Sequence, residues 1–562
     1  MGLFKLEVAG SAMKTEIYMM PSAQPLTEAY IHQTDSNVDS LYGYHPERDE
    51  DWSRRLKRLQ DHPGSRADAS DVAKVLRTYN EKHHAHPNAM LAIKSIAEGA
   101  PVIVGGQQAG LWTGPIMVIH KAITIIQAAR FASQKLGTAV VPVFWIAGED
   151  HDWDEANHAY VMAADQSLRK LTVQRPEGPR TAVSRTVLDE SSWAAALEEL
   201  EQSLPHSEFK EGMLQQLKQA AEGANTLSDS FARILGYLFG EQGLVLIDAD
   251  DAGLRKLESP MFTRLIERND ELEQAYAGTA EQMKQLGYPL QADVVAGSAN
   301  LFVFQQDNGN ERTLLHKRDG LFQDRKGVVS WTKEELLALA ADRPEQLSNN
   351  VLTRPLMQDY VFPVLATVLG PGEIAYWGTT GEAFRTLGME MPIILPRLSF
   401  TLVEGTIDKH MAKYELSFED VVKRFDERKE AWLKEQDQLS IEEKFAAAKQ
   451  AFNDLYEPIV SLAASVQQGL AKLGETNRQK IVEQIEYLES KTKDAFSKQY
   501  EASIRQLDRI YSTLCPEGKP QERVVNCTVY WNRFGQDIIG KLLELPFDRS
   551  GTHRIVYLSR EE

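Results

Sequence analysis

The clearest hydrophobic pattern in the chain lies in residues 101–158. Pro101 to Val104 is a short apolar run that stops at Gly105-Gly106, which is typical of a buried parallel strand. A helical repeat follows, and Thr138 to Ala147 then forms a second apolar run. The helical repeat consists of Ile116, Ile119, Ala122, Ile123, Ile126 and Ala129. The pattern predicts a strand–turn–helix–strand unit, which places the glycine turn and the end of the second strand on one edge of a parallel sheet.

Two further stretches fit the same core. Gly243 to Ile247 predicts another parallel strand, followed by Asp248 and Asp250. These acids would lie on the ligand edge of the sheet, or they would cap the next helix. We therefore expect an α/β protein with a Rossmann-like parallel-sheet core. Its core segments would be 1–159, 241–285 and 346–403, with inserted connecting peptides at 160–240 and 286–345.

The second insertion shows strand patterns rather than a buried run. Leu290 to Phe304 and Thr313 to Phe322 predict antiparallel strands, and Asp319-Gly320 is a hairpin-turn sequence. Thr332 and Glu335 have the spacing of a capping box, so a helix should begin there.

Residues 404–514 change to a heptad-like pattern in a charged background. The first set of apolar residues is Phe452, Leu455, Ile459, Leu462, Val466, Leu470 and Leu473. A second set follows beyond Gly474, where we expect a break, and Pro458 should kink or divide the first helix. The pattern predicts a long antiparallel helical coiled coil, although an ordinary bundle would bury the same residues. A projecting arm leaves its stripe exposed, so we expect a homodimer through the coiled coil.

The C-terminal residues 515–562 return to short apolar runs and should fold back onto the core. Asn526 is one of several polar residues there that could reach a ligand. Cys515 and Cys527 are the only cysteines, and they are expected to pack as small apolar side chains.

Composition excludes several classes of protein. The net charge of −19 argues against nucleic-acid binding, which needs a basic face. No apolar run approaches the ~20 residues that a membrane span requires, and no secretory signal is recognisable, so we expect no membrane association and a cytoplasmic location. Two cysteines cannot form a disulfide framework or a four-thiolate zinc site.

Candidate chemistry gathers around the first unit. The turn Gly105–Gly110 could hold a phosphate or carboxylate, or it could be an ordinary loop, because it has neither a P-loop lysine nor a G-x-G-x-x-G spacing. Residues 149–155 hold five acids and His151 directly after a strand. This segment is either a solvated helix cap or a site, and the neighbouring Trp145 and Trp153 favour a site. Zinc held by Asp150, His151 and His158 stays an alternative, whereas the histidines of Lys82–His86 fit a solvated loop better than a metal site.

The segments GGQQAGLWTGP and WIAGEDHDWDEANH, in this order, resemble paired signatures of the BshC family, the cysteine-adding ligases of bacillithiol biosynthesis. Further matching segments begin at Asn350, Gly370, Pro392 and Pro520, so the resemblance covers nearly the whole chain. It implies a Rossmann-like core related to class I nucleotidyltransferases, connecting peptides and a dimerising coiled coil. It also implies the joining of cysteine to glucosaminyl-malate. The two ATP signatures of those nucleotidyltransferases are absent, and no lysine follows Pro396 in their place.

The expected reaction is amide formation between the cysteine carboxyl and the amine of glucosaminyl-malate, with ATP or another nucleotide as the expected activator. Asp150 and His151 are the candidate general bases, since an acid beside a histidine can hold the ring in its accepting tautomer. The residues expected to bind substrate or nucleotide are Gly106, Gln107, Gln108, Gly110, Thr113, Gly114, Glu149, Asp152, Trp153, Asn350, Arg354, Glu373, Tyr376, Trp377 and Arg397. The alternatives are a non-catalytic dimeric scaffold that binds a nucleotide or metabolite, and a metal-dependent hydrolase.

Overall fold

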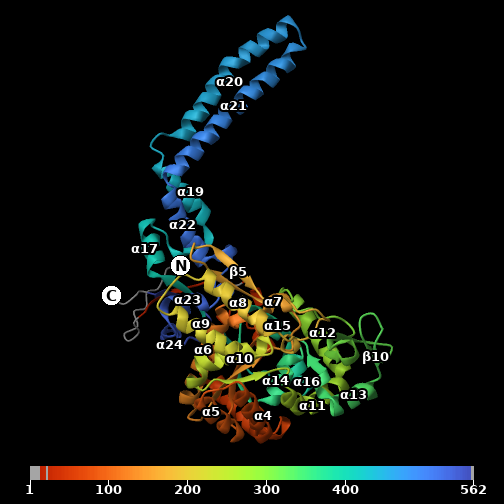
Figure 1. Cartoon of the computed structure of the whole chain (residues 1–562). Helices are drawn as coiled ribbons and strands as arrows, with labels where there is room; N and C mark the ends of the chain where they lie inside the picture. Colours follow the sequence, from red (N-terminus) through yellow and green to blue (C-terminus); the bar gives the residue numbers. More distant parts are fainter. Residues whose placement is uncertain (1–12, 21–22, 559–562) are drawn as a thin grey trace. The chain divides into compact units, whose positions relative to one another are not determined.

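A computed structural model of the chain describes residues 13–20 and 23–558. The residues form two compact units. The first unit comprises the chain up to Thr401 together with Glu522–Val556, and the second is mainly Leu402–Gln521. Figure 1 shows the elements of both units.

A five-stranded sheet of order β13-β12-β2-β3-β6 forms the centre of the first unit. All its pairings are parallel. The strands are β2 (Val102–Gln107), β3 (Val141–Ile146), β6 (Val245–Asp248), β12 (Val364–Leu369) and β13 (Ile393–Pro396). They are buried almost throughout, as the continuous apolar runs predict. The predicted Rossmann-like parallel sheet is therefore confirmed.

Helices pack on this sheet. Helix α6 (Met117–Leu136) contacts β2, β3 and β12, whereas α4 (Ala69–Lys82), α5 (Pro87–Ala97) and α10 (Leu227–Phe239) contact β6. Figure 1 shows α4 and α5 together in red-orange. The other helices of the unit are α1 (Pro25–His32), α2 (Asp39–Tyr42), α3 (Asp49–Asp61), α7 (Trp153–Ala156), α8 (Glu190–Ser203), α9 (Lys210–Ala221), α11 (Ala252–Glu267), α12 (Asn269–Gln285), α13 (Lys333–Asp342), α14 (Arg354–Val361), α15 (Pro371–Trp377), α16 (Gly381–Thr386), α23 (Thr528–Phe534) and α24 (Asp537–Leu543).

A second five-stranded sheet, of order β10-β9-β8-β7-β11, is antiparallel. Its strands are β7 (Ser298–Gln305), β8 (Glu311–Arg318), β9 (Leu321–Gln323), β10 (Ser330–Trp331) and β11 (Leu347–Asn349). Asp319 and Gly320 both have positive φ, 51° and 79°, between β8 and β9, which confirms the predicted hairpin turn. The capping box of Thr332 and Glu335 at the start of α13 is also confirmed.

Two smaller sheets complete the strands. β4 (His158–Met162) pairs with β5 (Leu168–Thr172) in antiparallel register. A three-stranded sheet has the order β1 (Lys14–Tyr18), β15 (His553–Leu558) and β14 (Ser399–Glu404).

The second unit is helical. Its helices are α17 (Gly405–Lys413), α18 (Phe418–Lys423), α19 (Phe425–Gln436), α20 (Ile441–Val466), α21 (Leu470–Gln499) and α22 (Glu501–Leu514). α20 and α21 run side by side as an antiparallel hairpin (Figure 1). Helix α20 continues through Pro458, so the helix is not divided there.

The break expected at Gly474 is wrong. Gly474 lies inside α21, and the turn of the hairpin falls between Val466 and Leu470. A Cβ on Gly474 would lie 3.2 Å from the side chain of Val460. The missing side chain therefore lets the two helices approach each other, and does not end one of them.

The C-terminal segment of the first unit is anchored to the core by Glu522. The two terminal guanidinium nitrogens of Arg397, Nη1 and Nη2, donate to its carboxylate at 2.8 and 2.6 Å. Ser399 Oγ donates to it at 2.9 Å, and His120 Nδ1 lies 2.8 Å from it. Burial acts to raise the pKa of Glu522, but Arg397 and His120 outweigh it and hold this pKa well below the ordinary value. The anchor is therefore a buried, charged pair.

We predict that Glu522→Gln destabilises the first unit by about 3–5 kcal/mol, because it leaves the buried guanidinium of Arg397 without a counter-charge. Urea unfolding of the purified variant measures the effect. Glu544→Gln, which changes an exposed residue of the same segment, is the control. Equal unfolding midpoints for the two variants would contradict the prediction.

Candidate functional site

The carboxyl ends of the five parallel strands lie along one edge of the central sheet. Gln107 pairs with Ile146, Ile146 pairs with Asp248, and Leu369 at the end of β12 is followed by Gly370. The glycine turn after β2, the acidic segment after β3 and the start of α15 therefore lie along one edge, as the pattern predicts.

Lys121 of α6 is the centre of the first group of charges, which we call the Lys121 cluster. Its Nζ donates to the main-chain oxygen of Gly106 at 2.6 Å, to Gln107 Oε1 at 3.2 Å and to Glu373 Oε2 at 2.6 Å. Three acceptors use all three ammonium hydrogens. Burial lowers the pKa of Lys121, while Glu373 acts to raise it. The cluster ties the end of β2 to the start of α15.

Sequence reasoning missed Lys121. Its signal is a lone lysine in the apolar stretch of α6, where the neighbouring side chains are buried. A lysine in such a place needs a carboxylate partner. For Glu373, burial acts to raise its pKa, but Lys121 and Arg354 outweigh burial and lower it.

Arg354 lies beside this cluster, and part of its hydrogen-bonding capacity is unused. In the part of the chain that the structure describes, one hydrogen bond is found for the guanidinium, from Nη2 to Tyr376 Oη at 2.6 Å. Burial acts to lower the pKa of Arg354, but Tyr376, Glu373 and Glu149 outweigh it and raise this pKa. Arg354 is therefore a cation whose remaining N–H groups can bind an anion.

A second group of charges follows β3 and β6. Arg255 is fully buried, and it donates to Glu149 at 2.5 Å and to Glu258 at 2.7 Å. Arg185 donates twice to Asp250, at 2.7 Å each. Glu149, predicted as a ligand residue, is thus already paired within the chain.

Asp248 is a buried acid, and no cation is found bonded to it among the residues that the structure describes. Its Oδ1 accepts the N–H of Asp250 at 2.8 Å. Burial, and then the negative charge of Asp250, raise its pKa to about 8. Asp248 is therefore protonated at neutral pH, so it adds no negative charge to the carboxyl edge of the sheet.

Asp150 and His151, the predicted catalytic pair, lie together but without the predicted bond. Asp150 Oδ1 is 3.7 Å from His151 Nδ1 and instead accepts the main-chain N–H groups of His151 and Asp152, at 2.7 and 3.2 Å. Nδ1 faces Arg312 Nη1 at 3.1 Å. The expectation that Asp150 holds His151 in the accepting tautomer is therefore wrong in this structure, because a cation occupies that nitrogen.

Two glycines of the turn pack closely against other parts of the chain. A Cβ on Gly106 would lie 2.9 Å from the main-chain oxygen of Trp145, and one on Gly110 would lie 3.0 Å from Gly114 Cα. Both glycines are thus required by packing of the chain itself.

The segment after this turn is strained and is held by the C-terminal segment. Trp112, Thr113 and Gly114 have φ values of 47°, 73° and 68°. Asn526 Nδ2 donates to the oxygens of Trp112 and Gly114, at 3.0 and 2.6 Å. Thr113 Oγ1 lies 3.4 Å from Cys527 Sγ, and burial raises the pKa of that thiol to about 11. Thr113 therefore faces the protein interior, contrary to its predicted ligand role.

Several other predicted ligand residues have structural partners. Asn350 Oδ1 caps the turn before α14 through the N–H groups of Leu352 and Thr353. Gln108 Nε2 donates to the oxygen of Asp152, and the Asp152 side chain caps α7. The clamp predicted for Arg397 binds Glu522, a carboxylate of the chain itself. Trp153 and Trp377 are buried.

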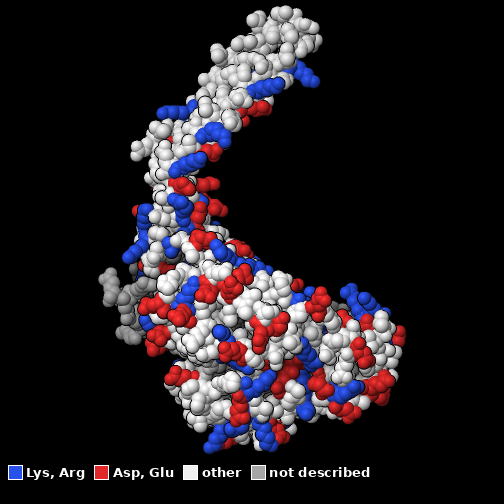
Figure 2. All heavy atoms as spheres, in the orientation of Figure 1, with Lys and Arg blue, Asp and Glu red and all other residues white. Residues whose placement is uncertain are grey.

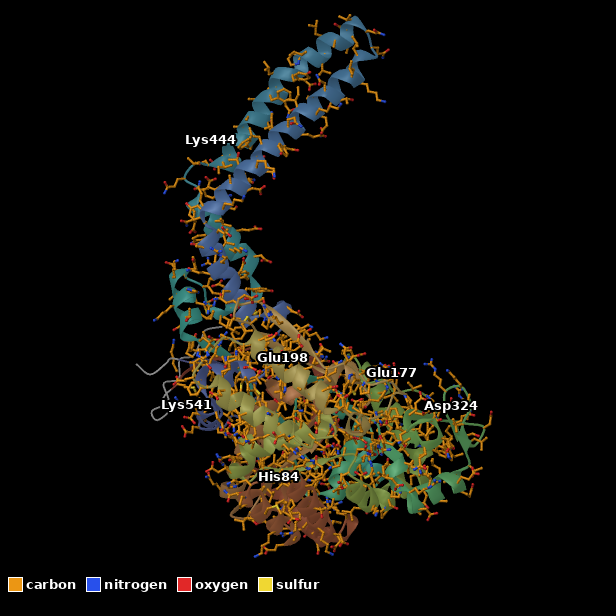
Figure 3. The ribbon with its side chains drawn as sticks, in the orientation of Figure 1. His84, Glu177, Glu198, Asp324, Lys444 and Lys541 are labelled. Atoms are coloured by element: carbon orange, nitrogen blue, oxygen red, sulfur yellow. The ribbon has the colours of Figure 1, made fainter. Side chains whose placement is uncertain are left out.

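Histidines and acids do not form a metal site in the described residues. No group of three His, Cys, Asp or Glu side chains is arranged there to hold a metal ion. His83 lies between the Tyr79 oxygen and Asp229, at 2.8 and 2.9 Å, and His84, labelled in Figure 3, is exposed. A cavity of about 660 Å³ opens at the opposite, amino edge of the sheet beside Pro101 and Thr138, and none of the predicted site residues lines it.

Fold and site together define a Rossmann-like α/β protein with charged side chains along the carboxyl edge of its sheet and a helical hairpin. Residues 13–398 match a family profile described as the N-terminal Rossmann-like domain of bacillithiol biosynthesis BshC, and residues 400–558 match its C-terminal coiled-coil domain. The chain belongs to the BshC family.

Named relatives span nearly the whole chain. A protein of Geobacillus sp. (strain WCH70) is 36% identical over 97% of this chain and 100% of its own length. One of Geobacillus thermodenitrificans is 38% identical over 96% and 99%, and one of Symbiobacterium thermophilum is 35% identical over 93% and 96%. All three carry the name "Putative cysteine ligase BshC". Across residues 13–20 and 23–558, no helix combines the length and apolar character that a bilayer crossing requires.

We predict that Asp248→Asn becomes increasingly stable relative to the parent protein as pH rises from 5 to 8. The folded protein holds a proton on Asp248 up to a pKa of about 8, whereas the unfolded chain releases it near pH ~4. Folding therefore binds a proton in this window, and the parent protein loses stability as pH rises, until the loss is complete above the folded pKa. The asparagine variant has no such proton to bind.

Thermal unfolding at several pH values measures the difference between the two proteins. Asp342→Asn, which removes an exposed carboxylate at the end of α13, is the control and should stay parallel to the parent. A constant difference between Asp248→Asn and the parent over this range would contradict the prediction.

Proposed function

We propose that this protein is a ligase that joins the carboxyl of L-cysteine to the amine of glucosaminyl-malate, the last step of bacillithiol biosynthesis. The observation that carries the proposal is that a cation and an anion, each with unused hydrogen-bonding positions, lie on the same edge of the sheet. Arg354 has open donors beside Tyr376, and Asp150 is 40% exposed on the neighbouring acidic segment. Arg354 suits a carboxylate and Asp150 suits an amine, so this edge of the sheet can bind both a negatively and a positively charged substrate group. The names of the relatives support the same reaction.

Arg354 is the proposed anchor for a carboxylate of malate or cysteine. Its Nη2 donates to Tyr376 Oη at 2.6 Å, so the guanidinium is oriented before a ligand arrives. A guanidinium forms two parallel hydrogen bonds to a carboxylate, which fixes direction as well as position. This would hold the reacting groups in a defined geometry.

Asp150 is the proposed general base. An ammonium group cannot attack a carbonyl carbon until it loses a proton, so the reaction requires a proton acceptor near the amine. Asp150 Oδ1 is held by two main-chain N–H groups, which leaves Oδ2 for the amine. Lys121 is a poor alternative, because all its hydrogens are bonded to acceptors in the chain.

Condensing a carboxylate with an amine releases water, so the carboxyl must first be activated. We propose ATP or another nucleotide as the source of activation. The sequence assigned Thr113 and the glycine turn to a phosphate or a carboxylate group. Thr113 is buried beside Cys527, so no step is assigned through it.

A homodimer through the coiled coil is the second part of the proposal. The predicted stripe lies on the surface of the hairpin, and Figure 2 shows the far end of the hairpin almost without charged side chains. Its exposed apolar residues are Leu455, Ile459, Leu462, Val466 and Leu473. An apolar surface of this kind is rarely left open to water, and a second copy of the hairpin would cover it.

Incubation with glucosaminyl-malate, cysteine and Mg-ATP, with product followed by mass, tests the reaction. We expect an amide product only when nucleotide is present, and AMP or ADP would identify the route of activation. Asp150→Asn should lower turnover by about 10²–10⁴-fold if Asp150 is the base, and Asp154→Asn, on an exposed carboxylate of the same segment, should not. Absence of product with folded, dimeric protein would favour the non-catalytic scaffold instead.

The dimer is tested by light scattering after size-exclusion chromatography. We expect twice the mass of one chain for the parent protein and the mass of one chain for Ile459→Glu, because a buried carboxylate without a partner opposes association. Val328→Glu, at an exposed apolar residue of the first unit, is the matched control and should remain dimeric. A monomeric parent protein would refute the proposal.

A further inference from the structure

Arg312, a residue of the inserted sheet, reaches into the candidate site. It lies on β8, its guanidinium carbon stands 3.8 Å from the centre of the Phe302 ring, and 6% of its side chain is exposed. Nε donates to Ser348 Oγ at 3.0 Å and Nη2 donates to the oxygen of Asn349 at 2.7 Å. Strands β7, β8 and β11 therefore fix the direction of the remaining nitrogen, Nη1.

Nη1 of Arg312 points at His151 Nδ1, 3.1 Å away. A guanidinium has hydrogen-bond donors and no acceptor, so His151 Nδ1 must accept with its lone pair. A neutral imidazole with an accepting Nδ1 carries its proton on Nε2. Arg312 thus decides the tautomer of the ring.

The other charged groups near His151 do not oppose this assignment. Burial lowers the pKa of His151, Arg312 and Arg180 lower it further, and Asp150 and Asp152 act to raise it. The ring is therefore neutral at neutral pH. Asp150 lies 3.7 Å from Nδ1 and bonds to main-chain N–H groups, so it does not compete with Arg312 for this nitrogen.

We propose that Arg312 is a positioning residue that fixes His151 with its proton on Nε2, so that His151 donates a hydrogen bond to an oxygen of the reacting carboxyl and does not act as the base. The identity of that oxygen rests on the proposed ligase function, whereas the tautomer does not. A fixed donor at this oxygen stabilises the negative charge that develops there when the amine attacks. Asp150 takes the proton of the ammonium group before the attack. The C–N bond then forms, and the bond between the carbonyl carbon and the activating group breaks, so that this group leaves with the bonding electrons.

The inserted sheet becomes part of the site under this assignment. A second arginine, Arg185, also stacks on an aromatic ring of this sheet, and it provides a matched control. Arg185 stands 3.6 Å from the Phe304 ring of β7 and bonds to Asp250 on the same edge, but no contact with His151 is found for it in the described residues. Arg185→Met and Arg312→Met both remove an arginine stacked on the inserted sheet, and only Arg312→Met removes the partner of His151.

Nitrogen NMR of protein labelled with ¹⁵N-histidine, with the His151 signals assigned by their loss in His151→Gln, tests the tautomer directly. In the parent protein we expect the Nε2-protonated form at pH 7.5. In Arg312→Met we expect a mixture of tautomers and a higher pKa, while Arg185→Met keeps the parent signals. An Nδ1-protonated ring in the parent protein, or unchanged signals in Arg312→Met, would overturn the proposal.

Turnover separates this inference from the proposed function. If amide formation is observed, His151→Gln should keep most of the activity, since the glutamine amide still donates, and His151→Leu should lose it. Equal losses of about 10²–10⁴-fold in both variants would point to a general base and overturn the donor role. If no amide forms under any condition, the ligase proposal fails, and the NMR result still decides the tautomer.

Discussion

Lys121 and Arg255 are cations with almost no exposed surface, and the carboxyl edge of the sheet is arranged around neutralising them. A buried charge is tolerated only beside an opposite charge with good hydrogen-bond geometry. Lys121 therefore uses Glu373, and Arg255 uses Glu149 and Glu258. These pairs remove most of the edge charges from contact with a ligand. Arg354 and Asp150 are charged groups of this edge that keep hydrogen-bonding positions which the internal pairing does not use.

The same edge depends on contacts far apart in the sequence. Asn526 lies over 400 residues after the strained segment Trp112–Gly114 and donates to two of its carbonyl oxygens. Glu522 holds that C-terminal segment through Arg397. A residue in the last tenth of the chain thus keeps the turn after β2 in place, although it belongs to no motif of that turn.

The sequence was sufficient for the elements whose signal is local. The parallel strands, their acidic ends, the capping box of Thr332 and the Asp319-Gly320 turn follow from patterns within a few residues. Side-chain partners could not be predicted, because they come from distant segments. Arg312 lies in a strand that is mostly polar, and nothing in that strand indicates that it faces His151. The heptad pattern located the hairpin but misplaced its turn, since Gly474 reads as a helix breaker where it is a close contact with Val460.

The direction of each hydrogen bond along the edge limits the chemistry more than the residue types do. From residue types alone, an acid next to a histidine suggests that the histidine is a general base oriented by the acid, as in hydrolases. The structure places a guanidinium on the accepting nitrogen, so the histidine can only give a proton to a hydrogen bond, and the acid is the remaining acceptor. A donor and an acceptor side by side suit a reaction in which a carbonyl oxygen gains charge while an amine loses a proton. Amide formation has both of these requirements. The inserted sheet contributes to the site because it carries Arg312, the residue that sets the direction of the hydrogen bond to His151.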